Sequence, residues 1–411
     1  MPELKLLKKY AQLAVKVGAN VQKDQMLIVN SSTETRELAR LIVEAGYDAG
    51  AKSVSIMWSD PYVARLSYDG KAVETLENVP QWQIDRARYY VENKGCIISI
   101  TSPIPGLNAG VDPMKMQRAA IAQMKALKFA QDHMMANKTQ WNIIAAPNKV
   151  WAKQIFPELS EEEAVEELWK AILNASRVRD TNDPIQEWEE HNNRLVSHNR
   201  ELTNYQFESL HFSNSLGTDI TVKLVENHIW SGGIEDSAEG ITFNPNIPTE
   251  ENFTMPHKFG VNGKVVATKP LNYQGKLIEN FWLEFKDGKV INYDAEKQVE
   301  TLKNLLEVDP GSSHLGEVAL ISYDSPINKT GILFLNTLFD ENASCHFALG
   351  RAYPNTVVNG DSMTQEELQE VGYNHSMVHS DFMFGSKDLQ VTGIKKDGSQ
   401  VVVFKDGDYV I

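Results

Sequence analysis

The chain has 411 residues, of which 42% are apolar and 23% charged, and this favours an ordinary globular protein with two domains. Its formal net charge of −15 argues against nucleic acid as the main partner, because a phosphate backbone selects basic surfaces. Its only two cysteines, Cys96 and Cys345, make a disulfide framework unexpected and exclude a cysteine-rich zinc site.

The first residues do not have the pattern of a signal peptide. Lys5, Lys8, Lys9 and Lys16 interrupt the apolar residues there, so no clean apolar region remains. No stretch of the sequence is long and apolar enough to predict a membrane span. Together with the sparse cysteines, these features predict a cytoplasmic protein with no membrane partner.

The first half of the sequence alternates short apolar runs with helical patterns. Apolar residues recur at helical spacing over residues 6–17 and 38–45, and Gly18 and Gly46 are expected to end these two helices. Short apolar strands separated by helices predict a mostly parallel sheet with helices packed on it. The predicted strands are residues 26–29, 54–58, 96–100 and 141–146.

Two more helices are expected before residue 200. Ser160 and Glu163 have the spacing of a capping box, which predicts a helix that continues through Leu173. Residues 187–201 have a polar helical pattern and are a candidate for the link between two domains. We therefore predict an N-terminal α/β domain over residues 1–200.

After about residue 200 the sequence alternates apolar and polar residues around turns. An Asp-Gly turn between two such runs is a strong hairpin signal. The predicted pairs are 207–214 with 219–226 and 282–285 with 290–293, and a strand at 401–404 follows a turn at Asp397-Gly398. A helix is expected at 295–306. This pattern predicts a C-terminal β-rich α+β domain over residues 201–411.

Seven of the ten histidines lie beyond residue 200. Four polar segments there place acids or histidines beside apolar runs: residues 248–253, 315–320, 338–350 and 375–382. In the last segment, an extended chain puts His379 and Asp381 on one face, whereas a helix pairs His375 with His379. The apolar residues after Asp381 favour the extended form.

Carboxylates and imidazoles are ligands that Zn, Co and Mn all accept. A bridging carboxylate holds two such ions roughly 3.5–4 Å apart, and a water shared between them becomes a strong nucleophile. The sequence contains no His-Glu-x-x-His motif, which disfavours a one-zinc helix-based protease, and no Gly-x-Ser-x-Gly or P-loop pattern. From these residues alone, a metal site and purely structural polar clusters are both open.

Five strings of the sequence closely resemble the M29 family of metalloaminopeptidases, often called aminopeptidase T, aminopeptidase S or PepS. They are VGANVQKDQMLIV, NIPTEENFTMPH, LGEVALISYDSPINKTG, LFDENASCHFALGRAYP and NHSMVHSDFMFGS. The resemblance spans essentially the whole chain. It implies an enzyme that releases N-terminal residues from peptides with a free N-terminus, and a homodimer whose active sites face an enclosed space.

The resemblance also implies a dinuclear site for two divalent ions of Zn, Co or Mn. Matched string by string, the implied metal ligands are Glu251, Glu317, Glu341, His346, His379 and Asp381. Glu317 is the implied bridge, and Glu341 is either a ligand or a supporting acid. Tyr353 matches a family tyrosine close to the metals. None of these positions is altered in this chain.

In this interpretation a metal-bound hydroxide attacks the scissile carbonyl, Glu317 shuttles the proton, and Tyr353 helps to stabilise the oxyanion. Asp324 and Asn342 are expected to orient the imidazoles, and Cys345 to pack beside the site. Two alternatives are open. One is a metal-dependent amidase or carboxypeptidase with the same site. The other is a ligand-binding protein that uses the N-terminal α/β half.

Overall fold

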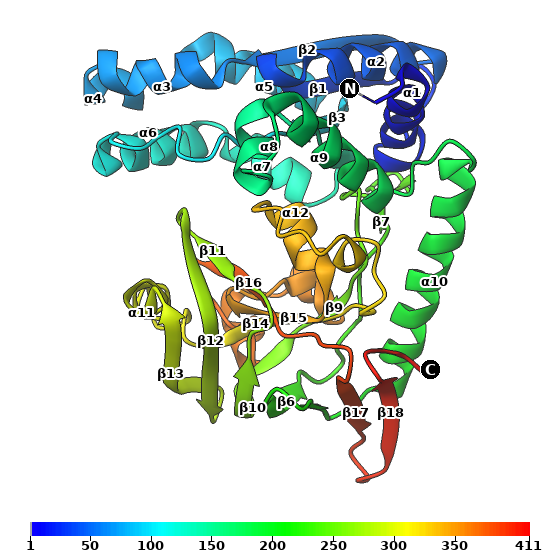
Figure 1. Cartoon of the computed structure of the whole chain (residues 1–411), viewed down its shortest axis with the longest axis vertical. Helices are drawn as coiled ribbons and strands as arrows, with labels where there is room; N and C mark the ends of the chain where they lie inside the picture. The colour runs from blue at the N-terminus through cyan, green and yellow to red at the C-terminus, as the bar shows by residue number, and fades with distance from the viewer. Residues whose placement is uncertain (1) are drawn as a thin grey trace. The chain divides into compact units, whose positions relative to one another are not determined.

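A computed structural model describes residues 2–411 of the chain (Figure 1). The chain forms two compact units. The first contains the residues up to Glu190 together with Ile234–Pro248, and the second contains His191–Gly233 together with Thr249–Ile411. The division into domains at residues 200 and 201 stays a prediction.

The first unit is built on a four-stranded parallel sheet in the order β2-β1-β3-β4. The strands are β1 (Met26–Ser32), β2 (Ser53–Ser59), β3 (Cys96–Thr101) and β4 (Trp141–Ala145). Leu27, Ile28 and Val29 are all buried, as a continuous apolar run in a parallel sheet requires. The predicted parallel sheet with flanking helices is confirmed, at the four predicted positions.

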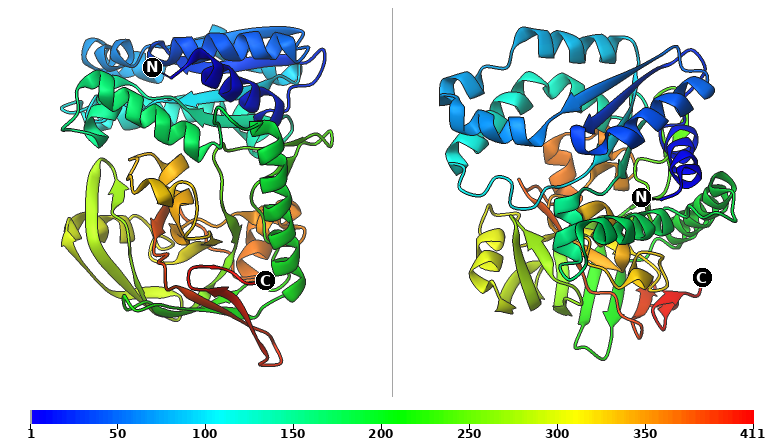
Figure 2. Two further views of the ribbon diagram at one scale, coloured as in Figure 1. Left: turned by 45° about the vertical axis from the view of Figure 1, so that its right-hand side comes forward. Right: turned by 45° about the horizontal axis from the view of Figure 1, so that its top comes forward.

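Helices flank this sheet. They are α1 (Leu4–Leu13), α2 (Arg36–Asp48), α3 (Pro61–Gly70), α4 (Val73–Glu77), α5 (Gln81–Glu92), α6 (Pro113–Ala126), α7 (Lys128–Met135), α8 (Lys149–Ile155) and α9 (Glu161–Ala175). The long polar helix α10 (Pro184–Tyr205) begins in the first unit, and its residues from His191 belong to the second. The predicted capping box of α9 is present, with both hydrogen bonds between Ser160 and Glu163. Figure 2 shows α10 as one uninterrupted helix. Within residues 2–411, no helix combines the length and the apolar character that a membrane crossing requires.

Residues 234–248 return to the first unit and contact β4 of its sheet through one isolated parallel bridge. They contain the short strands β7 (Glu235–Asp236) and β8 (Thr242–Phe243). The N–H of Ile143 in β4 donates to the carbonyl oxygen of Pro245 at 2.7 Å, and the N–H of Ile247 donates to that of Ile143 at 3.0 Å. The sequence pattern did not indicate this return.

The second unit contains a nine-stranded antiparallel sheet in the order β11-β12-β10-β6-β5-β17-β18-β19, with β13 paired to β12. These strands are β5 (Ser209–Ser213), β6 (Asp219–Leu224), β10 (Pro256–Val266), β11 (Leu271–Tyr273), β12 (Lys276–Lys286), β13 (Lys289–Lys297), β17 (Gln390–Ile394), β18 (Gln400–Lys405) and β19 (Asp408–Tyr409). The predicted pairings β5–β6 and β12–β13 and the predicted strand β18 are confirmed.

The helix predicted at residues 295–306 begins later than expected. α11 spans Val299–Leu306, and Ala295 is still part of β13, where it pairs with Phe281 of β12. Gln298 lies between strand and helix with a φ of 63°, a left-handed conformation that interrupts both elements. Cross-strand pairing therefore outweighs the helical pattern at the first predicted turn.

A smaller antiparallel sheet in the order β16-β15-β14-β9 packs against the large one. Its strands are β9 (Asn252–Thr254), β14 (Leu315–Leu320), β15 (His346–Gly350) and β16 (His379–Met383), and α12 (Thr337–Asp340) and α13 (Gln365–Glu370) lie in its connections. Phe347 of β15 lies edge-on to Phe212 of β5, with ring centroids 5.2 Å apart, and stacks on Phe384 at 4.2 Å. One face of the small sheet is therefore part of the core.

Candidate metal centre

The small sheet places the predicted ligands on the face that does not join the core. Side chains alternate along a strand, so β15 directs Phe347 into the core and His346 and Ala348 to the other face. Ala348 pairs with Glu317 of β14 on one side and with Asp381 of β16 on the other. Because Ala348 carries only a methyl group, the longer side chains of Glu317 and Asp381 have room above it.

The other ligand candidates lie at the beginnings of strands. His346 is the first residue of β15, His379 is the first residue of β16, and Glu251 directly precedes β9. His379 and Asp381 share a face of an extended strand, and the His379 Nε2 lies 3.2 Å from the Asp381 Oδ1. The extended conformation predicted for this segment is confirmed.

Glu317 lies at the centre of the cluster. Its Oε1 is 3.1 Å from the Nε2 of His346, and its Oε2 is 3.7 Å from the Nε2 of His379. The Oε2 of Glu251 lies 3.5 Å from the same nitrogen of His346. In each of two groups, three potential ligand atoms lie within 4.8 Å of one another. These groups are Glu251, Glu317 and His346, and Glu317, His379 and Asp381.

Burial and neighbouring charges shift the protonation equilibria of the cluster. Burial, and then the charge of Glu317, raises the pKa of Glu251 to about 8. Burial and the charge of Glu251 raise the pKa of Glu341 well above its ordinary value. Burial lowers the pKa of the histidines, but the adjacent carboxylates outweigh it and raise the pKa to about 9 in His346 and about 10 in His379. Such perturbed groups are concentrated at functional sites.

The second nitrogen of His379 is fixed by the backbone. Its Nδ1–H donates to the carbonyl oxygen of Arg351 at 2.7 Å. Because a carbonyl only accepts, Nδ1 carries a proton in this bond, so in the neutral ring that a bound cation would require, Nε2 would be the lone-pair nitrogen, and it faces Glu317 and Asp381. Metal-ligating histidines usually have such a bond on the nitrogen that does not bind the ion.

Tyr353 lies beside the cluster. Its ring centroid is 4.8 Å from that of His379 and 6.1 Å from that of Phe253, which lies edge-on to it. Burial and the charge of Glu317 raise the pKa of the Tyr353 hydroxyl, so it is a proton donor at neutral pH. Within residues 2–411 this hydroxyl makes no hydrogen bond, which leaves it available to a ligand.

Two side chains hold the loop that carries Glu251. The Nε2–H of the buried His191 donates to the carbonyl oxygen of Thr249 at 2.8 Å. The Oδ1 of Asn342 accepts the backbone N–H of Glu250 at 2.8 Å. The predicted role of Asn342 in orienting an imidazole is therefore wrong. It instead satisfies a buried backbone N–H, which cannot be left without an acceptor.

The remaining histidines and polar residues considered for the site lie outside the two ligand groups. His257, His314 and His375 belong to neither group, as expected of structural histidines. The expectation for Asp324 is wrong, because its carboxylate forms an exposed ion pair with a lysine at 3.1 Å. Cys345 is buried as expected, and burial raises the pKa of its thiol to about 12, so it is not a thiolate ligand.

Sequence reasoning missed two residues that shape the cluster. His191 lies on α10, and its contact with Thr249 spans 58 residues of sequence. Its only local signal is a histidine in a polar helix. Ala348 carries no polar group at all, so its importance comes only from its place between Glu317 and Asp381.

The donor set fits divalent metal ions. It consists of carboxylate oxygens and imidazole nitrogens, which Zn, Co and Mn accept. Glu251, Glu317, Glu341 and Asp381 bring four carboxyl groups together, and burial, followed by their mutual repulsion, raises the pKa of Glu251 and Glu341. Bound cations would remove this repulsion, because they supply the opposite charge in a place with little water.

A family model described as thermophilic metalloprotease (M29) matches residues 4–409. The chain belongs to the M29 family of metalloproteases. It is 44% identical to "Aminopeptidase 2" of Geobacillus stearothermophilus over 405 residues, with 98% of each chain covered. It is 43% identical to "Aminopeptidase AmpS" of Bacillus subtilis (strain 168) and 38% identical to "Aminopeptidase T" of Thermus aquaticus, again with 98% of each chain covered.

Solved structures agree with this membership. AmpT from Thermus thermophilus superposes with a TM-score of 0.91 at 36% identity, with 99% of each chain covered. A 2,5-dihydroxypyridine dioxygenase from Pseudomonas putida KT2440 superposes with a TM-score of 0.53 at 13% identity, which shows a shared fold alone. The predicted fold class and the predicted metal-dependent peptide hydrolase are confirmed for this M29 protein.

Proposed function

We propose that the chain is an aminopeptidase that removes N-terminal residues from peptides through a dinuclear metal site. The observation that carries this proposal is the position of Glu317, which belongs to both ligand groups and turns its two oxygens toward different histidines. A carboxylate in that position would hold two ions at once. The M29 relatives are named aminopeptidases, and this supports cleavage at the N-terminal end of the peptide.

In this proposal Glu251, Glu317 and His346 hold one ion, and Glu317, His379 and Asp381 hold the other. The ions are Zn, Co or Mn. When bound, such a pair polarises the scissile carbonyl and lowers the pKa of a water, so that hydroxide is available as the nucleophile.

Glu341 belongs to neither three-ligand group, although its carboxyl group is close enough to Glu251 for their charges to interact. Both oxygens of Glu317 face ligand positions, which leaves that residue poorly placed to carry a proton. We therefore propose that Glu341, whose raised pKa bound cations would bring down, receives the proton of the attacking water and passes it to the leaving amine. The hydroxyl of Tyr353 donates a hydrogen bond to the developing oxyanion.

The proposed substrate is a peptide with a free N-terminus, and the proposed assembly is a homodimer. Location in the cytoplasm also stays a prediction. A metal-dependent amidase or carboxypeptidase with the same ligands is the second candidate, because the cluster by itself does not determine which end of a peptide enters.

The test of the proposed function is metal analysis of the purified protein combined with an aminoacyl-anilide assay. We expect two divalent ions per chain, loss of activity on chelation, and recovery when Zn, Co or Mn is added back. Full activity in a rigorously metal-free preparation would contradict the proposal. Metal-dependent hydrolysis that leaves every unblocked aminoacyl reporter uncleaved would support the second candidate.

A further inference from the structure

Arg351 is a cation without a partner beside the proposed metal centre. It directly follows β15 and is exposed, and within residues 2–411 its guanidinium makes no hydrogen bond and no ion pair. Its backbone is held at two points. Its carbonyl oxygen accepts the Nδ1–H of His379 at 2.7 Å, and its N–H donates to the carbonyl oxygen of Val378, also at 2.7 Å. The side chain of Arg351 therefore starts from a fixed place next to a proposed metal ligand.

The charge of Arg351 acts on the hydroxyl of Tyr353. Burial, and then the charge of Glu317, raises the pKa of this hydroxyl, as do two further carboxylates of the cluster, whereas the charge of Arg351 lowers it. Because the interaction of two charges weakens with distance, the guanidinium and these carboxylates lie near the same hydroxyl. Tyr353 is the proposed donor to the oxyanion, so the free cation lies beside the place where the scissile bond is expected.

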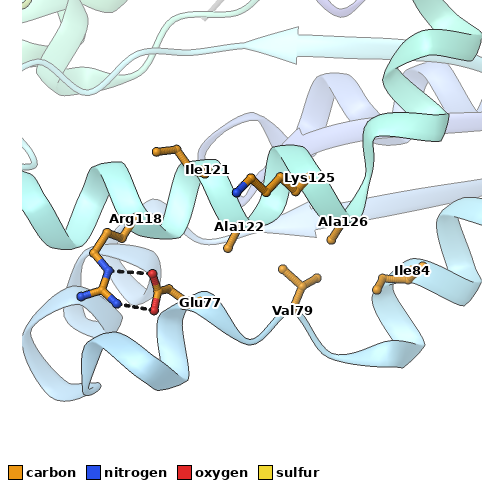
Figure 3. A pocket seen from close by; sticks show the side chains of 8 residues that line it. All are labelled: Glu77, Val79, Ile84, Arg118, Ile121, Ala122, Lys125 and Ala126. Carbon is orange, nitrogen blue, oxygen red and sulfur yellow. Dashed lines mark hydrogen bonds and ion pairs between the residues drawn. The ribbon is translucent and has the colours of Figure 1, made fainter.

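Arg118 of α6 shows how an arginine of this chain pairs when a carboxylate is within reach. Its Nε–H and an Nη–H each donate to an oxygen of Glu77 at 2.6 Å (Figure 3). These two charges neutralise each other at one end of a groove between α6 and the segment that joins α4 to α5. Arg351 lies near several carboxylates, yet its donors are unused. They are therefore available to a carboxylate that arrives with a ligand.

The proposed function indicates which carboxylate this is. Two divalent ions would balance the four carboxyl groups of the cluster, which leaves no surplus positive charge there for a second anion. A peptide with a free amine also ends in a carboxylate, and this group needs a positive partner where it leaves bulk water. In a dipeptide the carboxylate belongs to the residue just beyond the scissile bond, and each further residue moves it about 3.5 Å away. Only a short peptide therefore places its carboxylate near Arg351.

We propose that Arg351 binds the C-terminal carboxylate of short peptides, so that dipeptides and tripeptides are favoured over longer chains. The inference rests on the proposed aminopeptidase function and adds a substrate class to it. A guanidinium presents paired N–H groups that match the two oxygens of a carboxylate. In this role Arg351 selects the length of the substrate and takes no part in the chemical step.

The test measures kcat and KM of wild type and Arg351→Gln on dileucine, on dileucine amide and on leucine anilide. We expect the variant to lose about 10–100-fold in kcat/KM on dileucine, because a charge-assisted contact is lost. The loss should appear mainly in KM, since the contact exists before the transition state as well as in it. The amide and the anilide carry no carboxylate, so their rates should not change. Tetraleucine should also be cleaved equally by both enzymes.

Two further variants and metal analysis serve as controls. Arg200→Gln removes another exposed arginine of the second unit that has no partner within residues 2–411, and it should leave all rates unchanged. Arg351→Lys should recover part of the rate on dileucine, because it restores the charge without the paired N–H groups. The metal content of Arg351→Gln should equal that of the wild type, since no proposed ligand is lost.

Equal losses on dileucine and on its amide would overturn the proposed contact, because they would place the effect at the metal centre or at Tyr353. A wild-type rate of Arg351→Gln on dileucine would overturn it as well. In both cases the wild-type enzyme is active, so the proposed aminopeptidase function stands. A metal-loaded wild type that cleaves none of the unblocked substrates would overturn the proposed function, and this inference with it.

Discussion

Among residues 2–411 the Tyr353 hydroxyl donates to no acceptor, and its ring lies beside that of His379, a metal-ligand candidate. If it donates to the oxyanion, Tyr353→Phe removes an interaction that forms mainly in the transition state. We expect turnover to fall on the order of 100-fold, with little change in KM. Metal content should stay the same, since no ligand is lost. Steady-state kinetics and metal analysis of the variant measure both.

His346→Ala is the contrasting variant, because it should lower metal occupancy and activity together. A Tyr353→Phe enzyme with wild-type turnover would show that the ring only packs against His379 and Phe253. That result would end the proposed catalytic role of Tyr353 without affecting the metal ligands.

Ala348 illustrates how a residue without polar atoms controls a polar site. It lies between Glu317 and Asp381 on the ligand face of the small sheet. Ala348→Leu should fill the space above the strand and push these carboxylates apart. We therefore expect a lower metal content than in the wild type and a large loss of activity. Metal analysis after exhaustive dialysis is the measurement.

The next residue on the same strand is the control for Ala348. Leu349 is buried on the core face. Leu349→Ala should reduce the free energy of unfolding by about 2–5 kcal/mol through a cavity, while the folded protein keeps its metal content. If Ala348→Leu bound metal as wild type does, the proposed spacing of Glu317 and Asp381 would be wrong.

At the level of elements, the ligands depend on how the loop before β9 is held. The Oδ1 of Asn342, in the turn after α12, accepts the N–H of Glu250, and His191 of α10 holds Thr249. Asn342→Ala leaves the N–H without its acceptor and frees the loop that positions Glu251. We expect metal affinity to fall by about 10–100-fold, as for other residues that orient ligands. Competition with a chromogenic chelator measures this affinity.

Asn328→Ala is a suitable control, because the Asn328 amide bonds a backbone carbonyl in an exposed turn. Its metal affinity should equal that of the wild type. Unchanged affinity in Asn342→Ala would mean that the strand pairing of β9 with β14 is sufficient to place Glu251.

At the scale of the whole molecule, the fold does not determine the chemistry. A dioxygenase shares the fold at 13% identity, so the fold alone does not set the reaction, and we propose that the side chains on the small sheet do. Membership in the M29 family rests on the full length of the chain, with 98% coverage of relatives at 38–44% identity.

Which end of a peptide is cleaved depends on how the complete enzyme binds its substrate. If recognition includes the free amine, acetylating the N-terminus of a peptide removes both its charge and its lone pair. We expect cleavage to fall at least 100-fold on acetylated peptides compared with the same free peptides, because a site built to bind a polar group rejects a substrate that lacks it. Equal rates on both would favour the amidase or carboxypeptidase alternative. Liquid chromatography of the products distinguishes the cases.

The sequence alone determined the local elements and the family. The parallel strands of the first unit, the capping box at Ser160 and the hairpins of the second unit follow from apolar periodicity and turn residues, which act over a few positions. The ligand set came from strings that resemble a known family, and the structure brings together five of those six residues in two groups.

Only the tertiary structure decided how distant residues meet. The return of residues 234–248 to the first sheet, the contact of His191 with Thr249 and the space above Ala348 all depend on pairing between segments far apart in the chain. The late start of the helix expected at residue 295 has the same origin, because Ala295 pairs with Phe281. Local patterns do not encode such contacts, since their free energy comes from strand pairing and burial that exist only in the folded chain.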